Sequence, residues 1–239
     1  IDRATLEPRW KLIGQDAWLS GDGAGASGPL ATGICGSGII EAVAELRMVG
    51  LLRPDGLFDE VRPTPRLRRR GRTFEYVLVG AAASASGSDI VITQNDVRAI
   101  QLAKAALYAG TSLLMHRLGV ARVDRVLLAG AFGSYISPLH AMALGLIPDC
   151  ELGRVTAGGN AAGDGARIAL LNRQARREAE RRAGWVEHVQ IATDPAFQET
   201  FVAAMALPHA SDPFPHLEGL LPEPVLTPAA AGTRRRQAR

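Results

Sequence analysis

The sequence predicts an α/β fold because it contains two junctions at which an apolar segment meets a cluster of small residues. In the first, the apolar strand 126–128 runs into a glycine-rich turn made of Gly130, Ala131, Phe132 and Gly133. In the second, the Gly- and Ala-rich residues 158–166 open an apolar helix. Glycine at a strand end lets a ligand or another backbone approach, since it has no Cβ. Free amides at a helix N-terminus can accept an anion.

Two such junctions in succession favour a nucleotide-binding cleft over a plain core, although close packing alone also explains glycines in these places. Neither junction has the spacing of a P-loop or of the dinucleotide-binding G-x-G-x-x-G turn. If a nucleotide binds, its site therefore belongs to another class of fold.

Composition narrows the class of protein further. A chain of 239 residues with 47% apolar content can bury a core in one large or two small domains. It contains no run of roughly 18–20 apolar residues that would cross a membrane, and Cys35 and Cys150 are too few for a disulfide framework. We therefore expect a cytoplasmic protein without a membrane partner. Five arginines lie among residues 66–72, but without interleaved aromatic residues they favour a solvated loop over a nucleic-acid site.

Apolar residues that recur at intervals of three and four predict the helices. We expect helices over residues 37–49, 94–118, 139–144, 161–183 and 194–205. Thr93 is placed as an N-cap, with Asp96 in position for a capping box. The pair Ser137-Pro138 is typical of a helix start, and Gly50, Gly119 and Gly145 of helix ends.

Short strands are expected around residues 11–13, 126–128, 154–156 and 189–191. Residues 61–62 and 74–79 are expected to be the arms of a hairpin around the arginine-rich loop 63–72. We assign residues 1–207 to a folded domain. Prolines recur beyond it and the chain ends in arginines, so residues 208–239 are expected to be a disordered tail.

Four motifs in order along the chain resemble those of one family. They are GICGSGIIEA at 33–42, ITQNDVR at 92–98, LAGAFGSY at 128–135 and GNAAG at 159–163. Together they resemble the ATP-binding C-terminal domain of the reductive activators of corrinoid proteins, also classified as a ferredoxin-linked domain of unknown function. That domain belongs to the superfamily of acetate and sugar kinases, actin and heat-shock chaperones. The resemblance implies an actin-like ATPase (ribonuclease H-like) fold, mainly its second lobe with an inserted hairpin.

The resemblance assigns nucleotide contacts to two segments. The turn from Gly130 to Gly133 sits where the superfamily has its adenosine motif, with Ala131 in place of a frequent second glycine. The other segment opens the first long helix and consists of Gly36, Ser37 and Gly38. Its free amides would face the nucleotide or merely cap the helix.

A third segment is assigned to the helix that crosses the hinge between the lobes, where small residues let helices approach closely. It consists of Asn160, Ala161, Ala162 and Gly163. We favour this structural role over direct contact with phosphate.

No catalytic or metal-binding residue is assigned. The nearest match to the superfamily's Asp-x-Gly phosphate loops, residues 22–25, follows no buried strand and is expected to be an exposed loop. In related activators of dehydratases, a cysteine at a similar Gly-rich helix start binds an iron–sulfur cluster across a dimer. This chain has one cysteine at that position, and Cys150 lies far away in the sequence. We therefore expect Cys35 to be a small, buried apolar residue rather than a cluster ligand.

The resemblance implies part of an ATP-dependent reductive activator that returns Co(II) corrinoid proteins to Co(I) for methyl transfer. ATP with magnesium and a 2Fe–2S cluster would belong to the full-length protein, and we expect this chain alone to bind neither. The implied partners are a corrinoid protein of a methyltransferase system and an electron-donating ferredoxin domain, and a homodimer stays open. Two alternatives remain: a non-catalytic domain of the same fold that docks a partner, and a small-molecule kinase.

Overall fold

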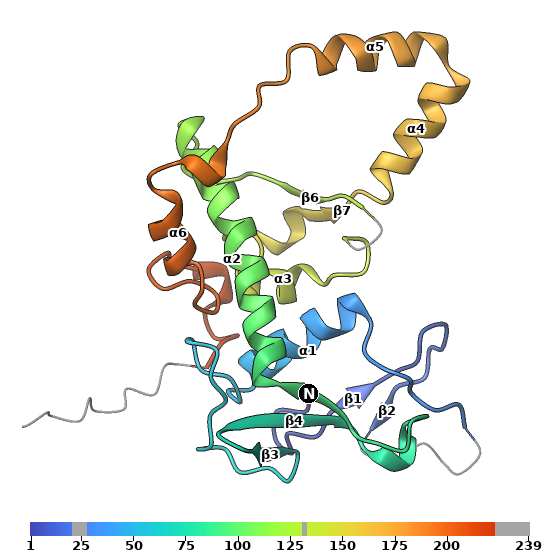
Figure 1. Cartoon of the computed structure of the whole chain (residues 1–239), viewed down its shortest axis with the longest axis vertical. Helices are drawn as coiled ribbons and strands as arrows, with labels where there is room; N and C mark the ends of the chain where they lie inside the picture. The colour runs from blue at the N-terminus through green and yellow to red at the C-terminus, as the bar shows by residue number, and fades with distance from the viewer. Residues whose placement is uncertain (21–27, 131–132, 223–239) are drawn as a thin grey trace, which may run out of the picture.

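The computed structural model describes residues 1–20, 28–130 and 133–222. Figure 1 shows the long helix α2 (Gln94–Arg117) running from an antiparallel sheet at the bottom of the molecule to the upper part. Thr93 Oγ1 accepts the Asp96 amide at 3.2 Å, and Asp96 Oδ2 accepts the Thr93 amide at 2.8 Å. This reciprocal pair is the capping box that the sequence predicted.

The lower sheet has the order β3 (Leu67–Arg70), β4 (Thr73–Val79), β5 (Ile90–Thr93), with both pairs antiparallel. The predicted hairpin is therefore wrong in its first arm. The arginine-rich residues form a strand rather than a loop, and the turn lies at Gly71, whose φ is +62°. Strand β5 was not predicted.

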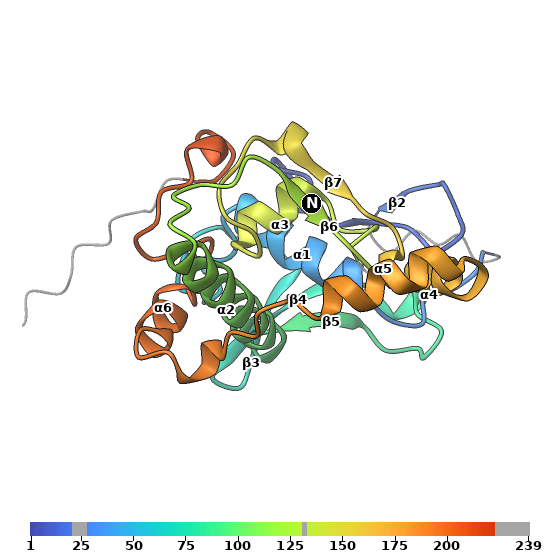
Figure 2. The same ribbon diagram turned by 90° about the horizontal axis from the view of Figure 1, so that it is seen from above.

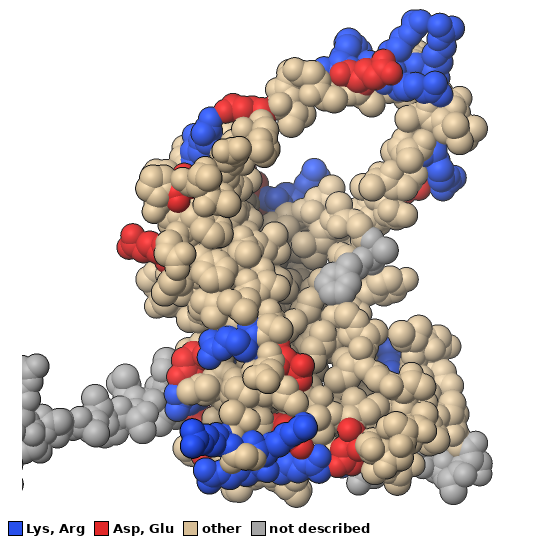
Figure 3. All heavy atoms as spheres, in the orientation of Figure 1, with Lys and Arg blue, Asp and Glu red and all other residues tan. Residues whose placement is uncertain are grey.

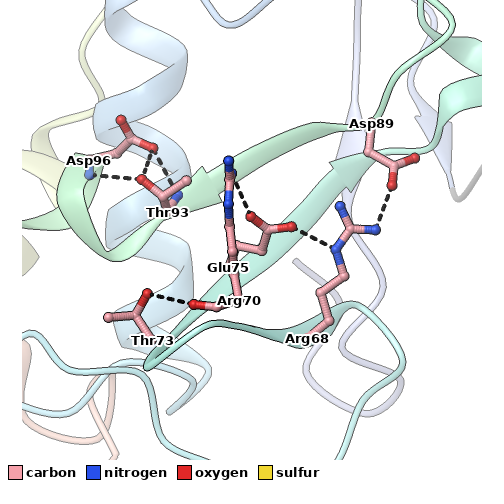
Figure 4. A network of polar contacts seen from close by, with 7 residues as sticks. All are labelled: Arg68, Arg70, Thr73, Glu75, Asp89, Thr93 and Asp96. Atoms are coloured by element: carbon pink, nitrogen blue, oxygen red, sulfur yellow. Dashed lines mark hydrogen bonds and ion pairs between the residues drawn. The ribbon is translucent and has the colours of Figure 1, made fainter.

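Ion pairs between neighbouring parts of the chain explain why the arginines adopt a strand. Glu75 on β4 is only 4% exposed, and it lies 2.7 Å from Arg68 Nε and 3.0 Å from Arg70 Nη1 (Figure 4). Arg68 also reaches Asp89 at 2.6 Å. Arginine and lysine side chains gather over this hairpin and again over α5 (Figure 3). The expectation of a solvated loop is thus corrected to a strand held by carboxylates.

Helix α1 (Gly36–Met48) packs on α3 (Pro138–Leu144) above the sheet. Their shared core includes Val43, Leu46 and Leu144, each fully buried. Both helices match the prediction, and both are followed by a glycine with positive φ, at Gly50 and Gly145.

The upper part contains a second, smaller sheet in which β6 (Val126–Leu128) pairs with β7 (Val155–Ala157) in parallel. The two strands follow the predicted positions closely. The strand expected at 11–13 is wrong, because the pairing residues are β1 (Arg9–Trp10) and β2 (Leu19–Ser20). The strand expected at 189–191 is also wrong, since the chain there enters a 3₁₀ turn at Ile191–Thr193. Further 3₁₀ turns lie at Ala81–Ala83, Leu152–Arg154 and Pro215–Leu217.

The helix predicted over residues 161–183 is interrupted. Asn172 separates α4 (Ala161–Leu171) from α5 (Arg173–Ala183), and its Oδ1 accepts the amides of Gln174 and Ala175 at 2.9 and 3.0 Å. A side chain that caps a new helix competes with continuation of the old one. The two helices form an arch that stands away from the rest of the molecule (Figures 1 and 2). Helix α6 (Phe197–Ala203) returns to pack on α2.

Buried side chains bind four successive backbone carbonyls after α6. Gln101 Nε2 donates to Met205 O at 2.7 Å, and Arg47 Nε donates to Leu207 O at 3.1 Å. Lys104 Nζ donates to Ala206 O and, at 2.6 Å, to Pro208 O. We refer to this set of donors and carbonyls as the carbonyl clamp.

The chain remains packed beyond the clamp. Leu217 is 2% exposed, and His216 Nδ1 lies 2.6 Å from Asp149 Oδ2. The disorder expected from residue 208 therefore does not apply to residues 208–222, whose apolar side chains pack into a hydrophobic cluster. Within the described ranges, we find no helix with the length and apolar character needed to cross a membrane.

Candidate functional site

The candidate site is built at the carboxyl ends of β6 and β7. Past the strands, the Gly158 amide donates to Leu128 O at 2.8 Å and the Gly130 amide donates to Gly159 O at 2.7 Å. These bonds hold the two predicted glycine-rich segments side by side. In open α/β sheets, ligands bind beyond the carboxyl ends of the strands, so this is the edge where a nucleotide is expected.

The two glycines of the predicted adenosine turn have different physical reasons to be glycine. Gly130 has φ = +101°, and apart from its own atoms and its chain neighbours no described atom lies within 4 Å of where its Cβ would be. A Cβ on Gly133 would lie 3.0 Å from the carbonyl carbon and oxygen of Leu128. Gly130 therefore borders open space, whereas Gly133 packs closely on Leu128 and leaves little room for a side chain. Ala131 and Phe132 lie outside the described residues.

The first turn of α1 is organised by Cys35, which is its N-cap. Cys35 Sγ accepts the Gly38 amide at 3.3 Å and lies 3.5 Å from Ser37 Oγ. A Cβ on Gly38 would come within 3.1 Å of the same sulfur. Gly38 thus serves the cap, which leaves Gly36 and Ser37 as the candidates for a ligand contact.

Cys35 is exposed, so the expectation of a buried apolar cysteine is wrong. The hydrogen bond from the Ser37 hydroxyl, together with the amides of this turn, lowers the pKa of the Cys35 thiol. Its position directly before the helix is the sequence signal for a cap. Cys150, by contrast, is buried.

The predicted hinge residues open α4. Asn160 is its N-cap and accepts the Gly163 amide at 3.1 Å, while a Cβ on Gly163 would collide with the Asn160 side chain. None of the α4 residues is buried. The apolar side chains Ile168, Leu170 and Leu171 are 55%, 74% and 82% exposed. The described contacts therefore give this helix a capped start but do not include a close helix crossing.

The three predicted segments lie on one side of the molecule. In Figures 1 and 2, the first turn of α1 faces the same side as the carboxyl ends of β6 and β7 and the start of α4. Segments from distant parts of the sequence are thus gathered where the parallel strands end.

Sequence reasoning missed His140, which links α3 to α1, the helix that begins at Gly36. His140 Nε2 on α3 lies 2.9 Å from Glu45 Oε1 on α1. Chiefly because of this hydrogen bond, the pKa of Glu45 falls to about 2. The signal in the sequence was the pair Glu41 and Glu45, one helical turn apart on the face that meets α3.

Comparison with known proteins agrees with the family resemblance of the sequence motifs. A family model described as the C-terminal domain of RACo, the ASKHA domain, matches residues 1–218. The chain is 39% identical over 181 residues to the corrinoid activation enzyme RamQ of Eubacterium limosum, a match that covers 71% of this chain and 30% of that protein. A solved structure, the reductive activator for corrinoid, iron–sulfur protein, matches with a TM-score of 0.71 and 32% identity, over 81% of this chain and 31% of that one.

These matches confirm the α/β actin-like fold and the resemblance seen in the motifs. The chain spans under a third of the length of both relatives, at 30% and 31%. Because the family model covers nearly the whole chain and the relatives agree with it, this chain belongs to the family of the C-terminal ASKHA domain of RACo.

Proposed function

We propose that this chain is the nucleotide-binding part of an ATP-dependent reductive activator, which returns Co(II) corrinoid proteins to Co(I) for methyl transfer. Family membership supports it, and both relatives are named for the activation of corrinoid proteins. The structural observation that carries the nucleotide assignment is Gly130. It combines a left-handed backbone with open space at the end of a parallel strand, as a turn that lies against a ligand requires.

Each segment has a distinct role in this proposal. The turn from Gly130 to Gly133 lies against the base and ribose, with Gly130 providing the approach and Gly133 the packing that fixes the turn. In α1, Gly36 and Ser37 face the nucleotide while Gly38 maintains the cap. Asn160, Ala161, Ala162 and Gly163 begin the hinge helix.

Residues outside this chain supply the remaining contacts. The described residues contain no group of three or more His, Cys, Asp or Glu side chains able to hold a metal ion. The nearest match to the Asp-x-Gly phosphate loops, residues 22–25, lies outside the described residues. We assign magnesium and triphosphate contacts to other parts of the full-length protein. The exposed apolar side chains of α4 fit a hinge helix covered by the other lobe. On this view residues 1–222 form one part of the actin-like domain.

The residues present do not fit an iron–sulfur cluster. A 2Fe–2S cluster takes four cysteine thiolates, and this chain has two cysteines, of which Cys150 is buried among apolar side chains. We therefore assign the cluster to an electron-donating ferredoxin domain elsewhere in the full-length protein. The corrinoid protein is the proposed partner, the cytoplasm the proposed compartment, and a homodimer stays open.

ATP would act on this domain by shifting a conformational equilibrium. A ligand shifts such an equilibrium only by the difference between its affinities for the two states. The role of this chain is to bind adenosine more tightly when the lobes are closed around it.

The experiment uses the full-length protein and its corrinoid protein in the Co(II) state, with dithionite as reductant. Formation of Co(I) is followed by its absorption, with and without ATP and magnesium. We expect reduction to depend on ATP. We expect Gly130→Ala to weaken ATP binding by about ten-fold, equivalent to ~1.4 kcal/mol, because alanine disfavours a φ of +101° and its methyl group enters the ligand's space.

The matched control is Gly119→Ala, which also adds a methyl group at a positive φ, +66°, but lies outside the segments assigned to the nucleotide. It should lower stability while the folded fraction binds ATP normally. Reduction of equal rate and extent without ATP, or normal ATP affinity in Gly130→Ala, would show that the proposed function or the site is wrong.

A further inference from the structure

Helices α1 and α3 connect the two segments assigned to the nucleotide. Helix α1 begins at Gly36, and α3 begins at Pro138, shortly after the turn that ends at Gly133. The helices pack directly on each other through apolar side chains. Whatever fixes α3 on α1 therefore also fixes the spacing of the two segments.

One polar side chain crosses this packed interface. His140 on α3 is 8% exposed, and its two ring nitrogens face two carboxylates of α1. Nε2 lies 2.9 Å from Glu45 Oε1, and Nδ1 lies 3.6 Å from Glu41 Oε1. Nδ1 is buried and has no hydrogen-bond partner among the described residues. The backbone nitrogen of Ile1 lies 2.8 Å from the other Glu45 oxygen, Oε2.

The protonation state of the His140 ring decides whether its Nδ1 attracts or repels the Glu41 carboxylate. Glu45 is ionised at neutral pH, so Nε2 must carry a hydrogen to bond it. In the neutral ring, Nδ1 then presents a lone pair toward the Glu41 carboxylate. In the protonated ring, both nitrogens are donors, and the imidazolium lies between two negative charges on one face of α1.

We propose that His140 is a positioning residue whose protonated ring ties α3 to α1 through Glu45 and Glu41, and so holds the first turn of α1 in register with the Gly130–Gly133 turn. The inference rests on the proposed nucleotide role of these segments. Its consequence is that ATP binds more tightly when His140 is protonated, and that this dependence on pH disappears when residue 140 cannot gain a proton.

The experiment measures ATP–magnesium affinity of the full-length protein by calorimetry at about pH 6 and about pH 8, which bracket the usual range of histidine titration. The comparison is with His140→Gln, whose amide can still donate to Glu45 but stays neutral. Protonation of ATP itself affects both proteins equally and cancels in the ratio. We expect the ratio of the pH 6 to the pH 8 affinity to be about five-fold larger in the wild type.

A second variant keeps the test valid if His140→Gln does not fold. Glu41 is half exposed, at 49% of its side chain, so Glu41→Gln removes the second charge with little risk to the fold. It should also flatten the pH profile. The matched control is Met142→Ala, which opens a cavity on the same helix but in a different apolar cluster. It should lower stability and leave the pH profile intact.

The outcomes separate the two proposals. If the wild type binds ATP and both His140→Gln and Glu41→Gln keep its pH profile, the positioning role is overturned while the proposed function stands. If Met142→Ala flattens the profile as well, general loosening of α3 is responsible and the inference also fails. If the wild type does not bind ATP at either pH, the proposed function itself fails, and this inference with it.

Discussion

Lys104 is fully buried, and its ammonium group donates to two backbone carbonyls instead of a carboxylate. Burial lowers its pKa to about 7. Replacing it with methionine keeps the apolar stem but leaves the carbonyls of Ala206 and Pro208 unpaired. We expect Lys104→Met to reduce the free energy of unfolding by about 1–3 kcal/mol, measured by urea denaturation near neutral pH.

The same side chain makes stability depend on pH with a defined sign. Its pKa in the folded state lies below that of the unfolded chain, roughly 10.4. Between about pH 7 and pH 10 the unfolded chain therefore binds more protons, and stability rises with pH. The rise should be present in the wild type and reduced in Lys104→Met. Equal slopes in both proteins would show that Lys104 does not titrate in this window.

Single residues show where sequence reasoning succeeds and where it stops. The Thr93 and Asp96 cap is local, so its spacing alone predicts it. The distinction between Gly130 and Gly133 depends on the distance to Leu128 and on a φ value, neither of which the sequence displays. His140 was missed because its partners are on another helix, far away along the chain.

At the scale of elements, helix caps offer a matched comparison. Thr93 caps α2 through its side chain, whereas Ser137 occupies the N-cap of α3 without a side-chain hydrogen bond. We expect Thr93→Ala to reduce the free energy of unfolding by about 1–2 kcal/mol and Ser137→Ala to change it by less than about 0.5 kcal/mol. Chemical denaturation of both variants tests this, and equal losses would contradict the assigned caps.

The misplaced elements depend on side-chain contacts that hydrophobic periodicity does not report. Strand β3 forms from an arginine run because Glu75 on β4 and Asp89, just before β5, hold its side chains. The break at Asn172 could have been predicted from the sequence, since asparagine is a favoured N-cap residue. The apolar periodicity on both sides of it favoured one continuous helix instead.

At the scale of the molecule, the parallel pair β6–β7 and helix α4 are only partly covered. Parallel sheets are normally buried on both faces, yet Leu127 in β6 is 57% exposed. We expect these 239 residues alone to bind ATP at least about ten-fold more weakly than the full-length protein, because the triphosphate and metal contacts are assigned to the rest of it. Calorimetry that finds micromolar, magnesium-dependent binding by this chain alone would contradict the assignment.

The carbonyl clamp has a consequence for how the protein is made. Synthesis proceeds from the N-terminus, so Arg47, Gln101 and Lys104 leave the ribosome well before their acceptors, which lie 160, 104 and 102 to 104 residues further along the chain. Until residues 205–208 emerge, these donors cannot be buried without an unpaired polar group. The interior around α2 therefore closes only after residues 205–208 have emerged, and until then this part of the nascent chain stays open.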